Sequence, residues 1–149
     1  MTKEKIHCPT EAVEQTSLLR WAFYEQGAYP ELGLLYHIPN EGKRSARTGA
    51  AMKMQGMKPG FPDLGLPVAR GQYHGLYVEM KRREGETPTQ QQYDWLKALD
   101  AQGYAVCWAK GWEEAAQAIL HYLKTGTVHY SVLKCRAGEY HAAEAVNFG

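Results

Sequence analysis

The chain of 149 residues is 44% hydrophobic and 22% charged, which suits one globular domain with a core and excludes a disordered chain. No apolar run approaches the roughly 18 residues of a membrane helix, and the first residues lack an apolar signal segment. The three cysteines, Cys8, Cys107 and Cys135, form no CxxC pair, so we expect free thiols in a reducing cytoplasm.

The distribution of charge is more informative than its total. A net charge of +1 does not by itself indicate a nucleic-acid partner. No acidic residue lies between Glu41 and Asp63, whereas basic residues recur through this interval: Lys43, Arg44, Arg47, Lys53 and Lys58. A second basic cluster follows at residues 81–83. If both clusters share one face, they form a local basic surface; otherwise the first is a solvated helix face.

The first half of the chain is predicted to hold two helices and a short strand. Residues 8–27 have Thr10 as a candidate N-cap and Gly27 as a stop. The apolar stripe of this helix, near helical spacing, comprises Val13, Leu18, Trp21 and Ala22, with Leu19 and Tyr24 nearby. A turn then leads to a strand at residues 34–38. The next helix is expected over residues 43–57.

The second half is predicted to alternate strands and helices. Two strands, at residues 61–66 and 74–81, are joined by a loop of hairpin length. The following segments are expected as helix, strand and helix, at residues 87–104, 105–109 and 111–126. This order indicates an α/β fold in which a small mixed sheet is flanked by helices.

The last part of the chain is treated separately. We assign residues 1–126 to one domain and residues 127–149 to a C-terminal extension of unassigned role. Within the extension, residues 127–133 could form an edge strand and residues 138–146 a short helix. Dimer contact is the candidate role for this extension.

The strand at residues 74–81 carries charges at positions where a buried strand would be apolar. Side chains alternate across a strand, so Tyr77, Glu79 and Lys81 share one face and Val78 and Met80 lie on the other. Burying such charges without partners costs several kcal/mol each. We therefore expect them at an open edge or cleft, paired or holding an ion. The ordinary alternative is a solvated cross-strand pair.

A third polar group comes from the preceding strand. Asp63 directly follows Pro62, a residue tolerated at a strand start, and hairpin pairing would bring Asp63 close to Glu79. Two neighbouring carboxylates repel unless a hard divalent cation lies between them, and Mg²⁺ prefers one or two carboxylates with waters and phosphate oxygens. With Lys81 beside them, these groups suit metal-dependent hydrolysis of a phosphodiester.

Other hydrolase classes lack their motifs. No Gly-rich phosphate loop of the GxxxxGK[ST] type is present, so no nucleotide cofactor is expected. The six histidines are scattered without an HExxH or Cys/His zinc spacing. A non-catalytic DNA-binding module that keeps the same fold is the remaining alternative.

The motif Pro62-Asp63 followed by Glu79-Met80-Lys81 resembles that of the PD-(D/E)XK nuclease superfamily. Segments at residues 38–42, 56–64, 70–81, 87–96 and 103–123 together resemble the virus-type replication-repair nuclease (VRR-NUC) domain of phage and prophage proteins. The resemblance covers about residues 11–123. It implies a restriction-endonuclease-like core, Mg²⁺ or Mn²⁺ dependence, and cleavage of DNA.

The resemblance also implies roles for individual residues. Asp63 and Glu79 would be metal ligands together with the backbone carbonyl of Met80, and Lys81 the catalytic lysine. An acid on the first helix would join them, directly or through water: Glu11, with Glu14 as the competitor. Gln15, one turn after Glu11, and Gln92 match further family positions and are expected to contact the site or the DNA backbone. The loop Asn40-Glu41-Gly42 departs from the Asn-Gly-Gly of relatives.

The expected partner is DNA with a branched structure such as a Holliday junction. Stand-alone phage members of the family form homodimers, so a homodimer is expected here as well. The phosphate contacts would come from Lys43, Arg44, Arg47 and Lys53, which would position DNA without reading its sequence. Affinity should then depend strongly on salt.

Overall fold

The computed structural model describes residues 7–39 and 46–128. The elements in these ranges follow the order α1 (Glu11–Glu25), η1 (Pro30–Leu34), β1 (Tyr36–His37), α2 (Ala46–Met54), β2 (Leu64–Leu66), β3 (Leu76–Lys81), α3 (Gln90–Ala101), β4 (Ala105–Lys110) and α4 (Trp112–Thr125). The predicted order of helices and strands is confirmed. The short 3-10 helix η1 replaces the turn expected before the first strand.

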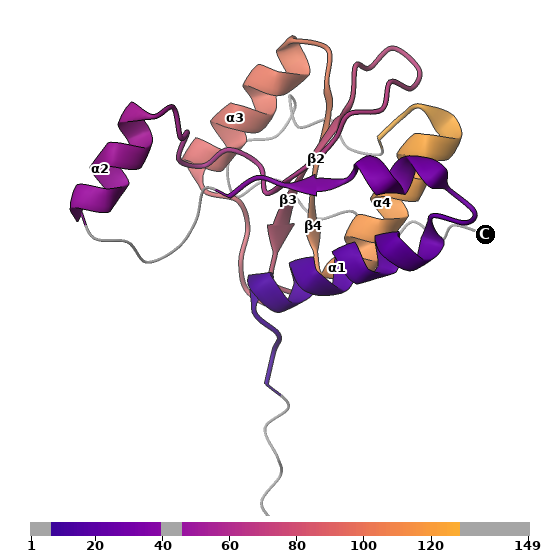
Figure 1. The fold of residues 1–149 in the computed structure, drawn as a ribbon, viewed down its shortest axis with the longest axis horizontal. Helices are drawn as coiled ribbons and strands as arrows, with labels where there is room; N and C mark the ends of the chain where they lie inside the picture. The colour runs from indigo at the N-terminus through magenta and orange to yellow at the C-terminus, as the bar shows by residue number, and fades with distance from the viewer. Residues whose placement is uncertain (1–6, 40–45, 129–149) are drawn as a thin grey trace, which may run out of the picture.

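The strands form one mixed sheet in the order β1-β2-β3-β4 (Figure 1). β1, β2 and β3 pair antiparallel, and β3 and β4 pair parallel with α3 as their connection. A parallel pair needs a crossover of this kind, whereas the antiparallel pair β2 and β3 needs only a loop. The α/β class with a small mixed sheet is therefore confirmed.

Helices cover both faces of the sheet. On one face, the main core joins α1 and α4 to the apolar side chains of the strands, among them Leu18, Leu64, Val78 and Ile119. On the other face, Tyr93 and Leu96 of α3 pack against Val106 and Trp108 of β4. Cys107 lies in the main core, where burial raises the pKa of its thiol to about 12.

Local sequence signals explain where the helices begin and end. The Thr10 side chain accepts a hydrogen bond from the Val13 backbone N–H at the start of α1. Thr89 and Gln92 form a capping box at the start of α3. Gly126 closes α4 in the left-handed conformation, which glycine adopts without steric cost.

The apolar stripe predicted for the first helix is wrong in part. Leu18 and Ala22 are buried, but the Val13 side chain is 53% exposed and Tyr24 is also exposed. The carboxylate of Glu14 occupies the inward-facing position in the first turn instead. It is buried because it has ionic and hydrogen-bonding partners, which periodicity alone does not reveal.

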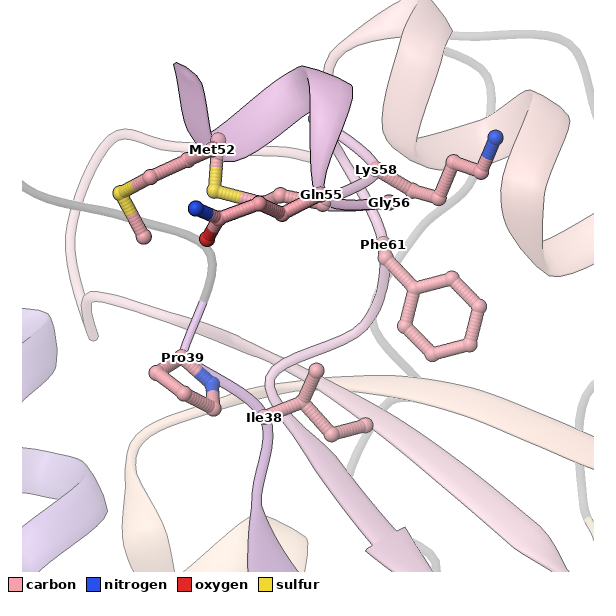
Figure 2. Close-up of a pocket in the computed structure, with 8 residues that line it drawn as sticks. Ile38, Pro39, Met52, Gln55, Gly56, Lys58 and Phe61 are labelled. Atoms are coloured by element: carbon pink, nitrogen blue, oxygen red, sulfur yellow. The ribbon is translucent and has the colours of Figure 1, made fainter. Parts of the chain in front are cut away.

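Helix α2 differs from the other helices because none of its residues is buried. It stands away from the sheet at one end of the molecule (Figure 1). A groove separates it from the end of β1 (Figure 2). No helix within residues 7–39 and 46–128 is long and apolar enough to cross a membrane. The strand and helix expected in the C-terminal extension fall, apart from Thr127 and Val128, outside the described residues.

Candidate active site

The hairpin register places Asp63 beside β3. Leu64 is opposite Val78, so Asp63, one residue before Leu64, comes level with Glu79. The Met80 backbone N–H donates a hydrogen bond of 2.8 Å to Oδ2 of Asp63. The Asp63 side chain is thus hydrogen-bonded to the backbone directly after Glu79. The residue is only 4% exposed.

The carboxylate of Glu79 is completely buried on the α3 side of the sheet. Nε2 of Gln92 donates a hydrogen bond of 2.8 Å to its Oε1 atom. The other end of the same amide, Oε1 of Gln92, accepts from the Thr89 backbone N–H. Because that second bond belongs to the capping box of α3, the helix start fixes the orientation of Glu79. The expected contact of Gln92 is thus seen with Glu79, and its contact with DNA stays a prediction.

Lys81 links the site to the first helix. Its Nζ lies 3.8 Å from Oε1 of Glu79 and 3.4 Å from Oε1 of Glu11. The residue is 5% exposed, so its ammonium sits between two carboxylates with little water around it. Such a location is tolerable because the charge is paired on both sides.

The expectation of an open edge or cleft for the charged strand is therefore wrong. β3 is an interior strand of the sheet, and both Glu79 and Lys81 are buried. The second condition, that such charges be paired, is the one that the structure meets. Hydrogen bonds and ion pairs from α1 and α3 compensate for lost hydration, so exposure is not needed.

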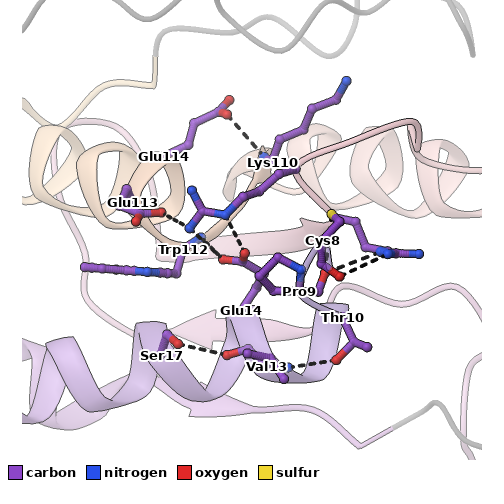
Figure 3. Close-up of polar contacts among 12 residues, drawn as sticks. Cys8, Pro9, Thr10, Val13, Glu14, Ser17, Lys110, Trp112, Glu113 and Glu114 are labelled. Atoms are coloured by element: carbon purple, nitrogen blue, oxygen red, sulfur yellow. Dashed lines mark hydrogen bonds and ion pairs between the residues drawn. The ribbon is translucent and has the colours of Figure 1, made fainter. Parts of the chain in front are cut away.

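The two candidate acids of the first helix have separate environments. Glu11 points to Lys81. Glu14 accepts hydrogen bonds from Nε of Arg83 at 2.6 Å and from the Trp112 backbone N–H at 2.7 Å (Figure 3). Glu14 therefore joins α1 to the end of β3 and the start of α4. Glu11 is the acid near the site, as preferred from the sequence, whereas Gln15 is half-buried and its role stays a prediction.

The side chains of the second basic cluster, residues 81–83, form contacts within the protein. Arg82 donates to the backbone carbonyls of Cys8 and Pro9 and so holds the segment before α1. Arg83 pairs with Glu14 and Glu113, and the bond to Glu14 raises the pKa of the guanidinium further. These side chains therefore do not supply the local basic surface that would arise if both clusters shared one face.

The first basic cluster is only partly described. Arg47 and Lys53 are exposed on α2, and Lys58 is exposed beyond its end. Lys43 and Arg44, with the loop at residues 40–42, fall outside the described residues. The contact of these basic residues with DNA stays a prediction.

Lys110 is a basic residue near the site that sequence reasoning missed. In the parallel register it is the direct neighbour of Lys81, so both side chains leave the sheet on the same face. Its Nζ lies 5.9 Å from the centre of the Trp108 ring. Figure 3 shows the side chain extending away from the Glu14 contacts. The sequence did contain a pattern that could have indicated Lys110: β3 and β4 are six-residue strands, and each ends in a lysine.

The donor set suits a hard cation better than zinc. Within the described ranges, no group of three or more His, Cys, Asp or Glu side chains is arranged to hold a metal ion. Two adjacent carboxylates, Asp63 and Glu79, are nevertheless the number that Mg²⁺ uses together with waters and substrate oxygens. Glu11 meets the site through the ammonium of Lys81. Its role as a ligand, direct or through water, stays a prediction.

The fold and this geometry define an α/β protein of the restriction-endonuclease-like class, with an aspartate and a Glu-x-Lys motif on neighbouring strands. The family model described as the VRR-NUC domain matches residues 10–113, and the chain belongs to the VRR-NUC family. A solved structure described as a "VRR_NUC domain protein" is 30% identical, with a TM-score of 0.69 over 80% of this chain and 92% of that one. No curated protein matches the chain.

Family membership confirms the resemblance drawn from the motifs. It places the chain among nucleases, hydrolases whose substrate is DNA. The similarity to the solved structure extends over most of both chains. Residues 114–149 lie beyond the family match.

Proposed function

We propose that this chain is a metal-dependent endodeoxyribonuclease that hydrolyses phosphodiester bonds and prefers branched DNA such as a Holliday junction. The observation that carries the proposal is the juxtaposition of Asp63, Glu79 and Lys81. Asp63 is tied to the Met80 backbone, and Lys81 lies 3.8 Å from Glu79. Family membership supports the nuclease chemistry, and the preference for branches comes from the family resemblance.

Asp63, Glu79 and the carbonyl of Met80 would hold Mg²⁺ or Mn²⁺. When bound, such an ion supplies polarisation of the phosphate and a lower pKa for a coordinated water. Lys81 orients the attacking water and offsets the negative charge that develops on the phosphate. The oxygen of water bonds to phosphorus and gives up a proton while a bond from phosphorus to a deoxyribose oxygen breaks, and the leaving oxygen gains a proton.

The supporting residues hold these groups in place. Gln92 orients Glu79 through its hydrogen bond, and the first turn of α1 brings Glu11 to Lys81. Exposed Arg47 and Lys53 supply phosphate contacts without sequence readout, and Lys110 adds a cation beside Lys81. We further propose a homodimer, whose two-fold symmetry would match that of a four-way junction.

The proposal is tested with purified protein and four substrates: four-way junction, flap, nicked duplex and linear duplex. Each is incubated with Mg²⁺, Mn²⁺ or EDTA, and products are resolved on denaturing gels. We expect cleavage with either metal, none in EDTA, and faster cleavage of branched substrates. Cleavage in EDTA would refute the metal mechanism, and equal rates on all substrates would refute only the structural preference.

Substitutions at Asp63 and Lys81 test whether cleavage takes place at this site. Asp63→Asn should abolish cleavage because it removes the carboxylate charge, while its amide oxygen can still accept from Met80. Lys81→Ala should also abolish cleavage. The matched control is Asp94→Asn, a carboxylate on the exposed side of α3 that bonds only to Gln90 in the described contacts. Binding of DNA without cleavage by the wild-type protein would instead favour the non-catalytic module.

A further inference from the structure

An apolar groove lies beside the candidate active site and has no role in the chemistry described above. Its volume is about 380 Å³, near the lower end of small-molecule sites, which span roughly 300–1,000 Å³. Ile38 and Pro39 after β1 form one wall, and Met52 of α2 lies across from them (Figure 2). Met57 and Phe61 also line the groove. The groove therefore has the size and surface to hold one flat apolar group.

The groove adjoins the carboxylates. The Ile38 backbone N–H donates a hydrogen bond of 2.7 Å to the backbone carbonyl of Asp63, so one strand spacing, about 5 Å, separates the two backbones. Phe61 is two residues before Asp63, and its ring packs edge-to-face against Tyr77 and Trp95. A group seated in the groove would thus lie next to a phosphate held at Asp63 and Glu79.

The charge around the groove indicates the chemistry of its occupant. Residues 46–62 contain no acid. Lys58 lines the groove, and Arg47 and Lys53 are exposed on the adjoining helix. Gln55 adds one amide that can donate and accept hydrogen bonds. An apolar interior with one lysine in its lining, beside a helix that exposes two further cations, fits a molecule that combines a flat ring with phosphates.

We propose that this groove receives an unpaired nucleobase of the DNA strand next to the bond that is cut. The inference rests on the proposed nuclease function and names the substrate feature that the site selects. Extruding a base from a stack costs free energy, and the cost is smallest when the base is already unpaired. Branch points and bulges offer such bases, whereas continuous duplex does not.

The composition of the groove predicts little discrimination among the four bases. Methionine side chains are flexible and adapt to ligands of different shape, and apolar contacts with a ring do not depend on its hydrogen-bonding edge. The groove should therefore select an unpaired nucleotide rather than a sequence.

The test compares two duplexes of one sequence that differ by a single unpaired nucleotide, a fluorescent adenine analogue. The protein is titrated with each duplex in EDTA. Affinity for both duplexes is measured by anisotropy, and the emission of the analogue is followed in the bulged duplex that carries it. We expect the bulged duplex to bind roughly fivefold or more tightly, the low end of stacking contributions per base. The emission should change on binding.

Two methionines on one helix provide the variant and its control. Met52→Ala removes a side chain that lines the groove and should reduce the preference to near one. Met54→Ala removes the same side chain from the same helix, but Met54 is 89% exposed and lies outside the groove, so the preference should persist. Because α2 buries no residue, both variants should unfold at the wild-type temperature.

Three outcomes would overturn the inference. These are equal binding of both duplexes by the wild type, an unchanged preference in Met52→Ala, and equal losses in both variants. A change in sedimentation of Met52→Ala without a change in preference would identify the groove as a contact between copies of the chain. Failure of this inference can be told apart from failure of the nuclease proposal. The latter would appear as the absence of metal-dependent cleavage by the wild-type protein.

Discussion

The basic residues of α2 and those that end and follow β3 look alike in the sequence but differ in the structure. Arg47 and Lys53 are exposed on a helix that buries nothing. Lys81 and Arg83 instead have carboxylate partners, at Glu11 and Glu79 for the lysine and at Glu14 and Glu113 for the arginine: four acids for two cations. A cluster of basic residues therefore indicates a nucleic-acid surface only where nearby acids do not already neutralise it.

Paired charges serve two different purposes in this molecule. Around Lys81 the pairing leaves a carboxylate and an ammonium beside Asp63, where substrate phosphate would lie. Around Arg83 the pairing joins α1, β3 and α4, since Glu14 also accepts from the Trp112 backbone N–H. Under the proposed function the first arrangement serves the chemistry, whereas the second maintains the packing of the elements around it.

The largest effect on stability is expected from Glu14→Ala. Glu14 is 1% exposed, and its removal leaves Arg83 and the Trp112 backbone N–H without this acceptor. The Arg83 side chain is 41% exposed and can regain water, so the loss comes mainly from the buried hydrogen bonds of Glu14 and should be about 1–3 kcal/mol of unfolding free energy. Urea denaturation measures the loss, and Glu113→Ala, at an exposed partner of the same arginine, should cost about 1 kcal/mol or less. Equal losses in the two variants would contradict the structural role given to Glu14.

A surface effect of intermediate size is expected from the double variant Arg47→Ala with Lys53→Ala. If each side chain contacts one phosphate, the salt dependence of DNA binding falls by about two units of slope. Stability should not change, because neither side chain is buried. Anisotropy titrations over a range of salt concentrations measure the slope. Arg82→Ala is the control, since its contacts are to Cys8 and Pro9, and a slope lowered by it would contradict the contrast between the clusters.

The sequence was sufficient for the order of elements and for the approach of Asp63 to Glu79. Alternation along β3 and the hairpin length together determine which side chains meet across β2 and β3. It also contained the Thr89–Gln92 capping box, a local pattern that explains why Gln92 reaches Glu79.

The features that were missed depend on contacts between distant parts of the chain. Glu14 is buried because Arg83, 69 residues later, supplies a partner. Helical periodicity assigned that inward position to apolar residues such as Val13, which is exposed. The proximity of Lys110 to Lys81 depends on parallel pairing across α3, whose register no hairpin fixes.

The smallest effect is expected from Glu114→Gln, which extends the contrast to the acids. Glu14 has a guanidinium partner, whereas Glu114 has the Lys110 backbone N–H and the charge of Lys110 nearby. Burial outweighs these contacts and raises the pKa of the Glu114 carboxyl above its ordinary value. A raised carboxyl pKa means that the folded state holds the proton more tightly than the unfolded chain. Its contribution to stability is therefore present below the unfolded pKa and is lost as pH rises through the folded one.

The glutamine variant removes this ionisation but keeps an oxygen that can accept from Lys110. Relative to wild type, Glu114→Gln should thus become slightly more stable at neutral pH than it is at acidic pH. Thermal unfolding at a series of pH values measures the difference. A variant whose relative stability falls as pH rises would show that the ionised Glu114 is favourably paired after all. In that case its environment would resemble that of Glu14, and the contrast between the two acids would have to be abandoned.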